Sequence, residues 1–454
     1  MMKRPLKEGL THVIEKNRMR FHMPGHKGRQ DFLLPLQWDF TEIPETDDLQ
    51  NPSGILRESQ ICAAQIFGAT DTYYLVNGAT GGLEAALLAV LKAGDRVVVP
   101  RNAHQSIHYG IEFAGAEPIY LMPVQEQNGL AAGVDPVAFE KVIEEKKPVA
   151  AVFIYPTYEG VCWDLPSLIA ICREYGVISI VDEAHGAHFS FFPTLPPSAV
   201  EMSADLVVQS AHKMLPAPTQ TALLHRASDV VPRAWIREAL RRTQTSSPSY
   251  LLLLGMEEAI AWMSQQHDPK ELLVLEACRK KIRTLPGIEL VEGKKQDPYK
   301  FVISALGRGF SGPELYEALR AGGLEPEWQQ GKHVLLMGAP YQERLAWTAL
   351  IEVLASLPEK KRHQMERPIS IEDQGIPERV MTTLEARRAK RTWIVMEESV
   401  GKIIAENLTP YPPGIPAILA GERMTEEIMH YLRRIKDENG KIYGENGKIP
   451  IVCE

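Results

Sequence analysis

Between residues 55 and 245 the chain alternates short apolar runs with longer segments of helical period. The apolar runs are rich in β-branched residues and are continuous rather than alternating, as is typical of strands buried on both faces of a parallel sheet. We predict strands at 72–76, 96–99, 118–121, 149–154, 177–181, 206–209 and 221–224, and helices at 55–67 and 82–91. The alternation predicts an α/β fold with a mainly parallel sheet, right-handed crossovers and helices on both faces.

The sequence after residue 250 predicts a second, smaller domain, a linker and a C-terminal domain. Helices are expected at 250–265 and 269–284, followed by a smaller α+β unit with strands at 300–304 and 333–337 around a helix at 312–321. Charged residues punctuated by proline then indicate a linker. The expected division is an N-terminal arm (1–50), a large domain (51–295), a small α+β domain (296–358), a linker (359–380) and a C-terminal domain (381–454).

Composition narrows the class of protein. A net charge of −8 over 454 residues gives no electrostatic support for nucleic-acid binding. The chain has no apolar run of 18 residues and no secretory leader at its start, so we expect no membrane partner. Its five cysteines are scattered without C-x-x-C spacing, which favours a reducing compartment. We therefore expect a cytoplasmic protein.

Two tetrads follow predicted strands and carry the candidate chemistry. Asp182-Glu183-Ala184-His185 ends one apolar run, and Ser210-Ala211-His212-Lys213 ends the next. Ligands of open α/β sheets bind beyond the carboxyl ends of the strands, so the Asp182 carboxylate and the Lys213 amine can face one ligand. Pyridoxal phosphate needs that pair, because its aldehyde binds a lysine as a Schiff base and its ring nitrogen is kept protonated by a carboxylate.

The other requirements of this cofactor also have candidates. Asn77 to Gly82 is a small-residue turn between a strand and a helix, where backbone N–H groups and Thr80 can bind a phosphate. Ser210 and His212 can add donors, and His104 can stack on the ring. Taken singly, each has a more common explanation: a solvated lysine, an aspartate that caps a helix, a tight turn or a structural histidine.

Two competing interpretations are weaker. Asp-Glu-Ala-His at 182–185 spells a helicase motif, but no G-x-x-x-x-G-K-[ST] loop accompanies it. The pairs His22/His26, His104/His108 and His185/His188 have the spacing of metal ligands, yet none forms H-E-x-x-H and a metal would leave Lys213 unexplained. We expect no metal site.

Taken together, these motifs resemble the Orn/Lys/Arg decarboxylase family, and in particular its short bacterial branch, which is similar to biosynthetic arginine decarboxylases. The resemblance rests on segments in the family's order along nearly the whole chain: Phe21 to Gly28, the turn at Gly78, Arg101 to His104, Asp182 to Gly186, Ser210 to Lys213, and Thr409 to Pro416 with Gly421-Glu422.

The resemblance implies an aspartate-aminotransferase-like fold (fold type I), pyridoxal phosphate as cofactor, and a homodimer or larger homo-oligomer with active sites at the subunit interface. It implies Lys213 as the Schiff-base lysine, Asp182 at the pyridine nitrogen, His104 stacked on the ring and His185 near the phenolic oxygen. The residues that it implies around the phosphate are Gly78, Ala79, Thr80, Ser210 and His212. Ala79 stands where the family often has Thr or Ser, so one phosphate donor is absent.

The implied reaction is decarboxylation of a basic amino acid, and we favour L-arginine to agmatine and CO2, a step of polyamine and spermidine biosynthesis. Lysine or ornithine is the alternative substrate. His26 and Glu159 are candidate substrate residues, and Glu159, Asp47 and Asp48 are candidates for the distal cation. An aminotransferase or lyase of the same fold is a rival function, for which Arg308 or Arg344 would bind the α-carboxylate. A non-catalytic regulator is the other rival, although such proteins typically lose the lysine or its aspartate.

Overall fold

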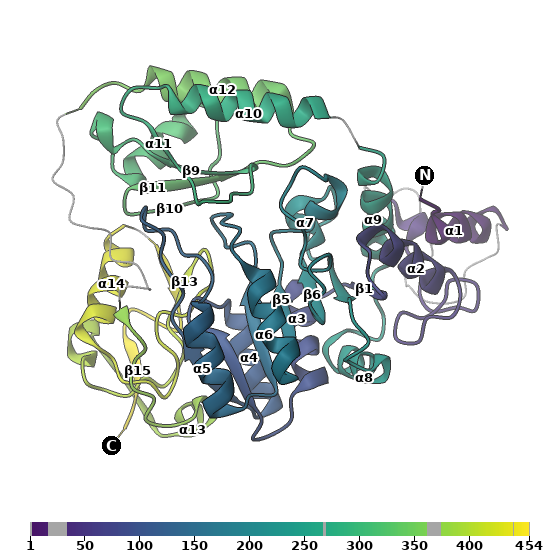
Figure 1. The fold of residues 1–454 in the computed structure, drawn as a ribbon, viewed down its shortest axis with the longest axis horizontal. Coiled ribbons are helices and arrows are strands. Elements are labelled where there is room, and N and C mark those ends of the chain that lie inside the picture. The colour runs from purple at the N-terminus through teal and green to yellow at the C-terminus, as the bar shows by residue number, and fades with distance from the viewer. Residues whose placement is uncertain (1, 17–33, 267–268, 361–373, 439, 454) are drawn as a thin grey trace.

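The computed structural model describes residues 2–16, 34–266, 269–360, 374–438 and 440–453, so His22, His26 and most of the predicted linker lie outside the described residues. Figure 1 shows a large central sheet, a smaller sheet at one edge of it and a C-terminal module beside both. In the described part of the chain, no helix is both long and apolar enough to cross a membrane.

The large sheet has seven strands in the order β1-β7-β6-β5-β4-β2-β3. Its strands are β1 (Asp71–Leu75), β2 (Arg96–Pro100), β3 (Glu117–Leu121), β4 (Ala150–Ile154), β5 (Ile178–Asp182), β6 (Leu206–Gln209) and β7 (Ala222–Arg226). Strands β3, β2, β4, β5 and β6 pair in parallel, whereas β7 runs antiparallel to both of its neighbours. The predicted mainly parallel sheet is therefore confirmed.

Helices cover both faces of this sheet, as predicted. On one face lie α3 (Gly78–Val90), α4 (Gln105–Ala114) and α8 (Arg233–Thr243), and on the other lie α2 (Ile55–Phe67), α5 (Pro136–Lys146), α6 (Leu165–Tyr175) and α9 (Tyr250–Met263). Successive strand residues serve opposite faces: Val97 and Val99 pack with α3 and α4, while Val98 packs with the other group. Both faces are apolar, which explains the continuous hydrophobic runs.

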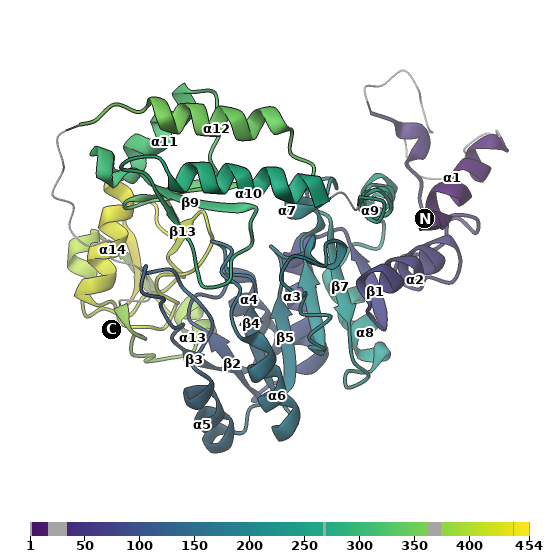
Figure 2. The same cartoon turned by 45° about the horizontal axis from the view of Figure 1, so that its top comes forward.

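The smaller sheet is antiparallel, in the order β10-β11-β9-β8. It contains β8 (Glu289–Val291), β9 (Lys300–Ser304), β10 (Trp328–Gln330) and β11 (His333–Met337), with helices α10 (Pro269–Arg283), α11 (Gly312–Ala321) and α12 (Arg344–Ser356). Figures 1 and 2 show α10 and α12 on the side of this sheet that faces away from the large sheet. Helix α11 begins at a capping box formed by Ser311 and Glu314.

The C-terminal module has its own apolar core, which includes Ile404, Ile418 and Leu432. It consists of α13 (Thr383–Arg388), β12 (Arg391–Ile394), β13 (Thr409–Tyr411), α14 (Glu426–Asp437), β14 (Lys441–Tyr443) and β15 (Ile449–Val452). The buried Arg101, at the end of β2, donates to the carbonyls of Pro416 and Ala417 and to the Glu422 carboxylate. This arginine anchors the module to the large sheet.

At the other end of the molecule, α1 (Pro5–Glu15) lies beside α2 and α9 (Figure 1). Backbone N–H groups of Leu6 and Lys7 donate to the two oxygens of the Glu257 carboxylate, and Arg4 pairs with Glu258. The first helix is thus fixed by the α9 carboxylates.

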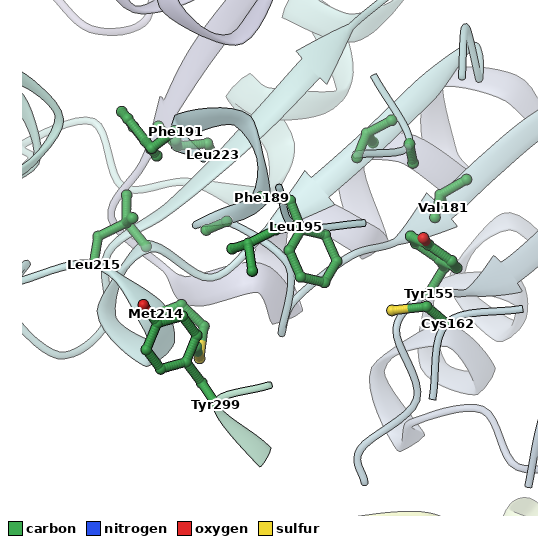
Figure 3. Packing of buried hydrophobic residues seen from close by; sticks show 14 of the residues in the cluster. Tyr155, Cys162, Val181, Phe189, Phe191, Leu195, Met214, Leu215, Leu223 and Tyr299 are labelled. Atoms are coloured by element: carbon green, nitrogen blue, oxygen red, sulfur yellow. The ribbon is translucent and has the colours of Figure 1, made fainter. Parts of the chain in front are cut away.

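Part of the buried core, drawn in Figure 3, includes the two residues that directly follow Lys213. Met214 and Leu215, which directly follow Lys213, are buried in the same cluster as Tyr155, Phe189 and Tyr299. Because close-packed side chains cannot shift without opening a void, this cluster restrains the backbone that carries the lysine.

Candidate active site

A cavity of about 610 Å³ lies beyond the carboxyl ends of β4, β5 and β6. Its walls come from the large sheet, from Glu327 and Met337 of the small-sheet region, and from the 411–415 segment of the C-terminal module. The cavity brings together ten residues that the sequence singled out: Gly78, Ala79, Thr80, His104, Glu159, Asp182, His185, Ser210, His212 and Lys213. His26, another candidate, lies outside the described residues.

Lys213 and Asp182 both line this cavity, and the charge of each affects the pKa of the other. Lys213 lies in the single turn α7 (Ala211–Met214) after β6, and Asp182 is the last residue of β5. Burial lowers the pKa of the Lys213 ammonium, and the Asp182 charge opposes that shift. Burial likewise raises the pKa of Asp182, against the charge of Lys213 and a hydrogen bond from the Ala184 N–H. A lower pKa increases the fraction of neutral amine, which is the form of lysine that attacks an aldehyde.

His185 joins this pair from the turn after β5. Its Nε2 lies 3.0 Å from Lys213 Nζ. Burial lowers the pKa of His185 well below its usual value, and the charges of Lys213 and Lys300 add to the shift. The imidazole is therefore neutral at physiological pH, and one ring nitrogen accepts while the other donates.

The small-residue turn has the geometry of an anion site. Gly78 begins α3 with φ +67°, a left-handed conformation that favours glycine. A Cβ at Gly82 would lie 2.5 Å from Leu75 and 2.9 Å from Val208, so this helix approaches the sheet as closely as a missing side chain allows. The first turn of a 13-residue helix thus presents backbone donors and the exposed Thr80 to the cavity. These residues fit a phosphate group.

His104 also lines the cavity, as the N-cap of α4. Its Nδ1 lies 2.8 Å from Ser106 Oγ, which fixes the plane of the ring. Burial, with a contribution from Lys213, lowers its pKa to about 4, so the ring is neutral at physiological pH. A fixed, neutral, flat ring in the cavity fits a stacking partner for an aromatic cofactor.

Some residues of this cavity were not predicted. Tyr158 donates its hydroxyl to Glu327 Oε1 at 3.0 Å, and its ring makes edge contacts with His185 and Trp328. Tyr411 of the C-terminal module lines the same cavity. The sequence signal was local at best, because Tyr158 is adjacent to the candidate Glu159 whereas Glu327 stands in no recognised motif.

Two other sequence candidates lie outside this cavity. The Asp47 carboxylate accepts backbone N–H groups of the loop that leads into α2, including those of Gly54 and Leu56, and Asp48 accepts from Gln50. Neither aspartate lines the cavity. Asp and Asn at loop-to-helix junctions commonly satisfy backbone donors in this way.

The two candidate arginine clamps also lie elsewhere. Arg308 donates to the carbonyls of Pro286, Ala355 and Leu357, and Arg344 pairs with Glu271. Neither arginine reaches the cavity. Across the described residues, no group of three or more His, Cys, Asp or Glu side chains is arranged to hold a metal ion.

Comparison with known proteins defines the class. The Orn/Lys/Arg decarboxylase major domain matches residues 4–297, and the C-terminal domain of the same family matches residues 371–447. The chain belongs to the Orn/Lys/Arg decarboxylase family. An uncharacterized Bacillus subtilis protein, YaaO, is 34% identical over 96% of this chain and 94% of its own length. An arginine decarboxylase of the same organism is 30% identical over 97% and 95%.

Solved structures support the fold. The constitutive lysine decarboxylase of Escherichia coli superposes with a TM-score of 0.83 at 20% identity, covering all of this chain and 82% of that one. The ureidoglycine-glyoxylate aminotransferase of Bacillus subtilis gives a TM-score of 0.53 over 66% of this chain and 83% of that one. The predicted family and fold type I architecture are therefore confirmed.

Proposed function

We propose that this chain is a pyridoxal-phosphate-dependent decarboxylase that converts L-arginine to agmatine and CO2. The observation that carries this proposal is one cavity lined by the Lys213 amine, the buried Asp182 carboxylate and a second carboxylate, Glu327, which accepts a hydrogen bond from Tyr158. A basic amino acid needs both ends: its α-carbon must meet the cofactor, and its distal cation needs a negative charge. The names of the Bacillus relatives support arginine over lysine and ornithine.

Each part of the site has a proposed role. When bound, the cofactor supplies the electron sink, its aldehyde held by Lys213 and its ring nitrogen by Asp182. The α3 N-terminus, with Gly78, Ala79 and Thr80, and the loop residues Ser210 and His212 would hold the phosphate. His104 would stack on the ring and His185 would lie at the ring's oxygen.

Decarboxylation also requires a proton and the exclusion of water. Loss of CO2 leaves a carbon that must be protonated, and the Lys213 ammonium is the candidate donor, with His185 beside it at 3.0 Å. Tyr158 and Tyr411 line the cavity beside Glu327, and Trp328 packs edge-on against Tyr158. We propose that these aromatic side chains cover the distal group once the substrate is bound, which would strengthen its attraction to Glu327. Half-buried Glu159, whose pKa burial raises, is a second candidate for substrate contact.

The cofactor assignment is tested by absorbance. Purified full-length protein mixed with pyridoxal phosphate should develop a band near the visible edge that persists after dialysis. Lys213→Ala should lose that band, whereas Lys294→Ala, a change at an exposed lysine, should keep it. A folded wild-type protein without the band contradicts the cofactor assignment.

The substrate is tested by competition. Arginine, lysine and ornithine supplied together should yield mainly agmatine over cadaverine and putrescine. Glu327→Gln should raise the KM for arginine about tenfold or more, since it removes the charge opposite the guanidinium, while Glu325→Gln should not. Cadaverine or putrescine as the main product would instead favour the lysine or ornithine alternative, and keto acid without CO2 would favour an aminotransferase.

We also propose that the protein forms a homodimer or a larger homo-oligomer in the cytoplasm. The five cysteines are all unpaired, and Cys162, Cys172 and Cys278 are buried as small apolar groups, which suits a reducing compartment. Light scattering coupled to size exclusion should give twice the 50.8 kDa chain mass or a higher multiple of it, and an active monomeric enzyme contradicts the proposed oligomer.

A further inference from the structure

Lys300 is a fully buried lysine that the proposed reaction does not use. It opens β9 in the small sheet and has no exposed surface. Its Nζ lies 3.0 Å from His185 Nδ1 and 3.0 Å from the sulfur of Met337, its register partner on β11. Burying a lysine is unfavourable unless its ammonium is hydrogen-bonded or its charge is compensated, so this placement calls for a reason.

The surrounding chain makes room for this side chain. A Cβ at Gly160, where φ is +91°, would lie 2.5 Å from Lys300 Cγ and 2.7 Å from its Cβ. Only glycine therefore allows the loop after β4 to pass over the lysine stem. Tyr299, the preceding residue, is packed in the same core cluster as Met214, which follows Lys213. The two lysines are thus held by one close-packed group.

The hydrogen bonds form a chain of three groups: Lys300 Nζ, the His185 ring and Lys213 Nζ, with 3.0 Å at each step. An ammonium has only donors. When Lys300 is protonated, His185 Nδ1 must accept, and the proton of the neutral ring must lie on Nε2. That Nε2–H then points at Lys213 Nζ, which can accept it only as a neutral amine.

The charges around Lys300 favour this arrangement at neutral pH. Burial lowers the pKa of Lys300 to about 8, and Lys213 adds to that shift, while the Asp297 carboxylate, with smaller contributions from Glu327 and Glu159, opposes it. Asp297 is itself buried and bonded to His188 at 3.2 Å, and the pKa of Asp297 is lowered despite its burial. Lys300 therefore keeps its proton through most of the physiological range.

We propose that Lys300 is a positioning residue: by donating to Nδ1 it fixes the Nε2–H tautomer of His185, so that the ring donates to Lys213. This inference deepens the function proposed above and rests on it for the catalytic meaning of Lys213. The hydrogen-bond geometry itself belongs to the chain alone, so it is testable without cofactor.

The direct test is nitrogen NMR of the full-length protein, labelled with ¹⁵N-histidine and without added cofactor, with the His185 signal identified by its loss in His185→Gln. We expect an unprotonated Nδ1 and a protonated Nε2 in the wild type. Lys300→Met, which keeps the length and removes the donors, should abolish this preference. Lys300→Arg, which also only donates, should retain it. A wild-type His185 protonated at Nδ1 overturns the proposal whether or not any variant folds.

A second readout follows Lys213. The pH dependence of its modification by an amine-reactive reagent, read by mass spectrometry, reports how readily it is deprotonated. Lys300→Met should slow this modification about tenfold at pH 7, because a nearby positive charge and the Nε2–H donor are both lost. The exposed control Lys294→Met should not change it. An unchanged profile in folded Lys300→Met overturns the proposal. If His185 is protonated at Nε2 as expected but the protein shows no absorbance band with pyridoxal phosphate, the proposed function is rejected and the role of Lys300 stands.

Discussion

Gly414 of the C-terminal module lies against the His104 ring of the large domain and restricts its position. A Cβ at Gly414 would lie 2.8 Å from His104 Nε2, and the Gly414 carbonyl accepts the Gln105 N–H at 2.9 Å. Gly414 has φ +94°, so this position favours glycine both for its left-handed backbone and for the absence of a Cβ next to His104. The face of the His104 ring that lines the cavity depends on this contact.

We therefore expect Gly414→Ala to displace the His104 ring and lower kcat/KM about tenfold or more, since small misplacements of groups around a reacting centre are costly. Steady-state decarboxylation measures the effect. Gly401→Ala is the matched control, because Gly401 also has a positive φ, +79°, in the same module but has nothing within 4 Å of its added Cβ. Both changes should cost about 1 kcal/mol in backbone strain. Equal activity losses in the two variants contradict the positioning of His104 by Gly414.

At the residue scale, the sequence predicted the groups that follow strand ends and missed the groups that meet through the fold. Asp182 and Lys213 were recognisable because each directly follows an apolar run, and parallel strands end at the same edge of the sheet. Tyr158 and Glu327 are 169 positions apart in the sequence and meet only because the small sheet lies over the cavity. The loop-capping role of Asp47 was not recognisable, because an aspartate that accepts backbone N–H groups looks, in sequence, like any other acidic residue.

At the scale of elements, the β2–α4 connection and the C-terminal module are joined by a buried ion pair. Arg101 and Glu422 are both 1% exposed and lie 3.1 Å apart. The Glu422 carboxylate also accepts the Leu419 N–H at 2.7 Å. Because Arg101 lies three residues before His104, this pair holds both the module and the loop that carries the histidine.

Glu422→Gln should destabilise the protein by about 3 kcal/mol, because it leaves the Arg101 charge buried without its partner. Urea denaturation monitored by tryptophan fluorescence measures this loss. Activity should fall with it under native conditions, since His104 loses its support. The exposed Glu427→Gln, in the same module, should leave both quantities unchanged. Full stability in Glu422→Gln contradicts the anchoring role.

A local sequence pattern predicted some strands of the structure and not others. Strands β2, β4, β5 and β6 were recognisable because both of their faces are buried, which makes them uniformly apolar. The antiparallel direction of β7 was not, because strand direction leaves no mark on composition. β8 and β10 have only three residues each and a mixed pattern, and β8 pairs with β9 although it lies before residue 296, where the sequence placed the small domain's start.

For the molecule as a whole, buried neutral histidines make stability depend on pH. His225 is fully buried between Thr72 and Gln209, and burial lowers its pKa to about 3; the pKa of His108 is lowered to about 3 for the same main reason. Below the usual histidine pKa of 6.5 the unfolded chain takes up protons that the folded chain does not, so unfolding is favoured as pH falls. The stability that these neutral rings contribute is fully present above that pH.

The free energy of unfolding should therefore fall between pH 6.5 and pH 3, by up to about 1.4 kcal/mol per pH unit for each such histidine. His225→Gln should make the free energy of unfolding less dependent on pH, by up to about 1.4 kcal/mol per pH unit. His430→Gln, at an exposed position, should leave that dependence unchanged. Denaturation curves at pH 7, 6 and 5 measure both. Parallel slopes for wild type and His225→Gln contradict the assignment of His225 as a buried neutral ring.

The cavity wall formed by Tyr411 to Ile415 has a consequence for synthesis of the chain. Lys213 emerges from the ribosome 198 residues before Tyr411 does. At typical translation rates of about 5–20 residues per second, that interval lasts about 10–40 s. Throughout it, the nascent chain carries the reactive amine and the turn at Gly78 but lacks one side of their enclosure. This side of the site is therefore completed only when the last fifth of the chain has been made, well after Lys213 itself.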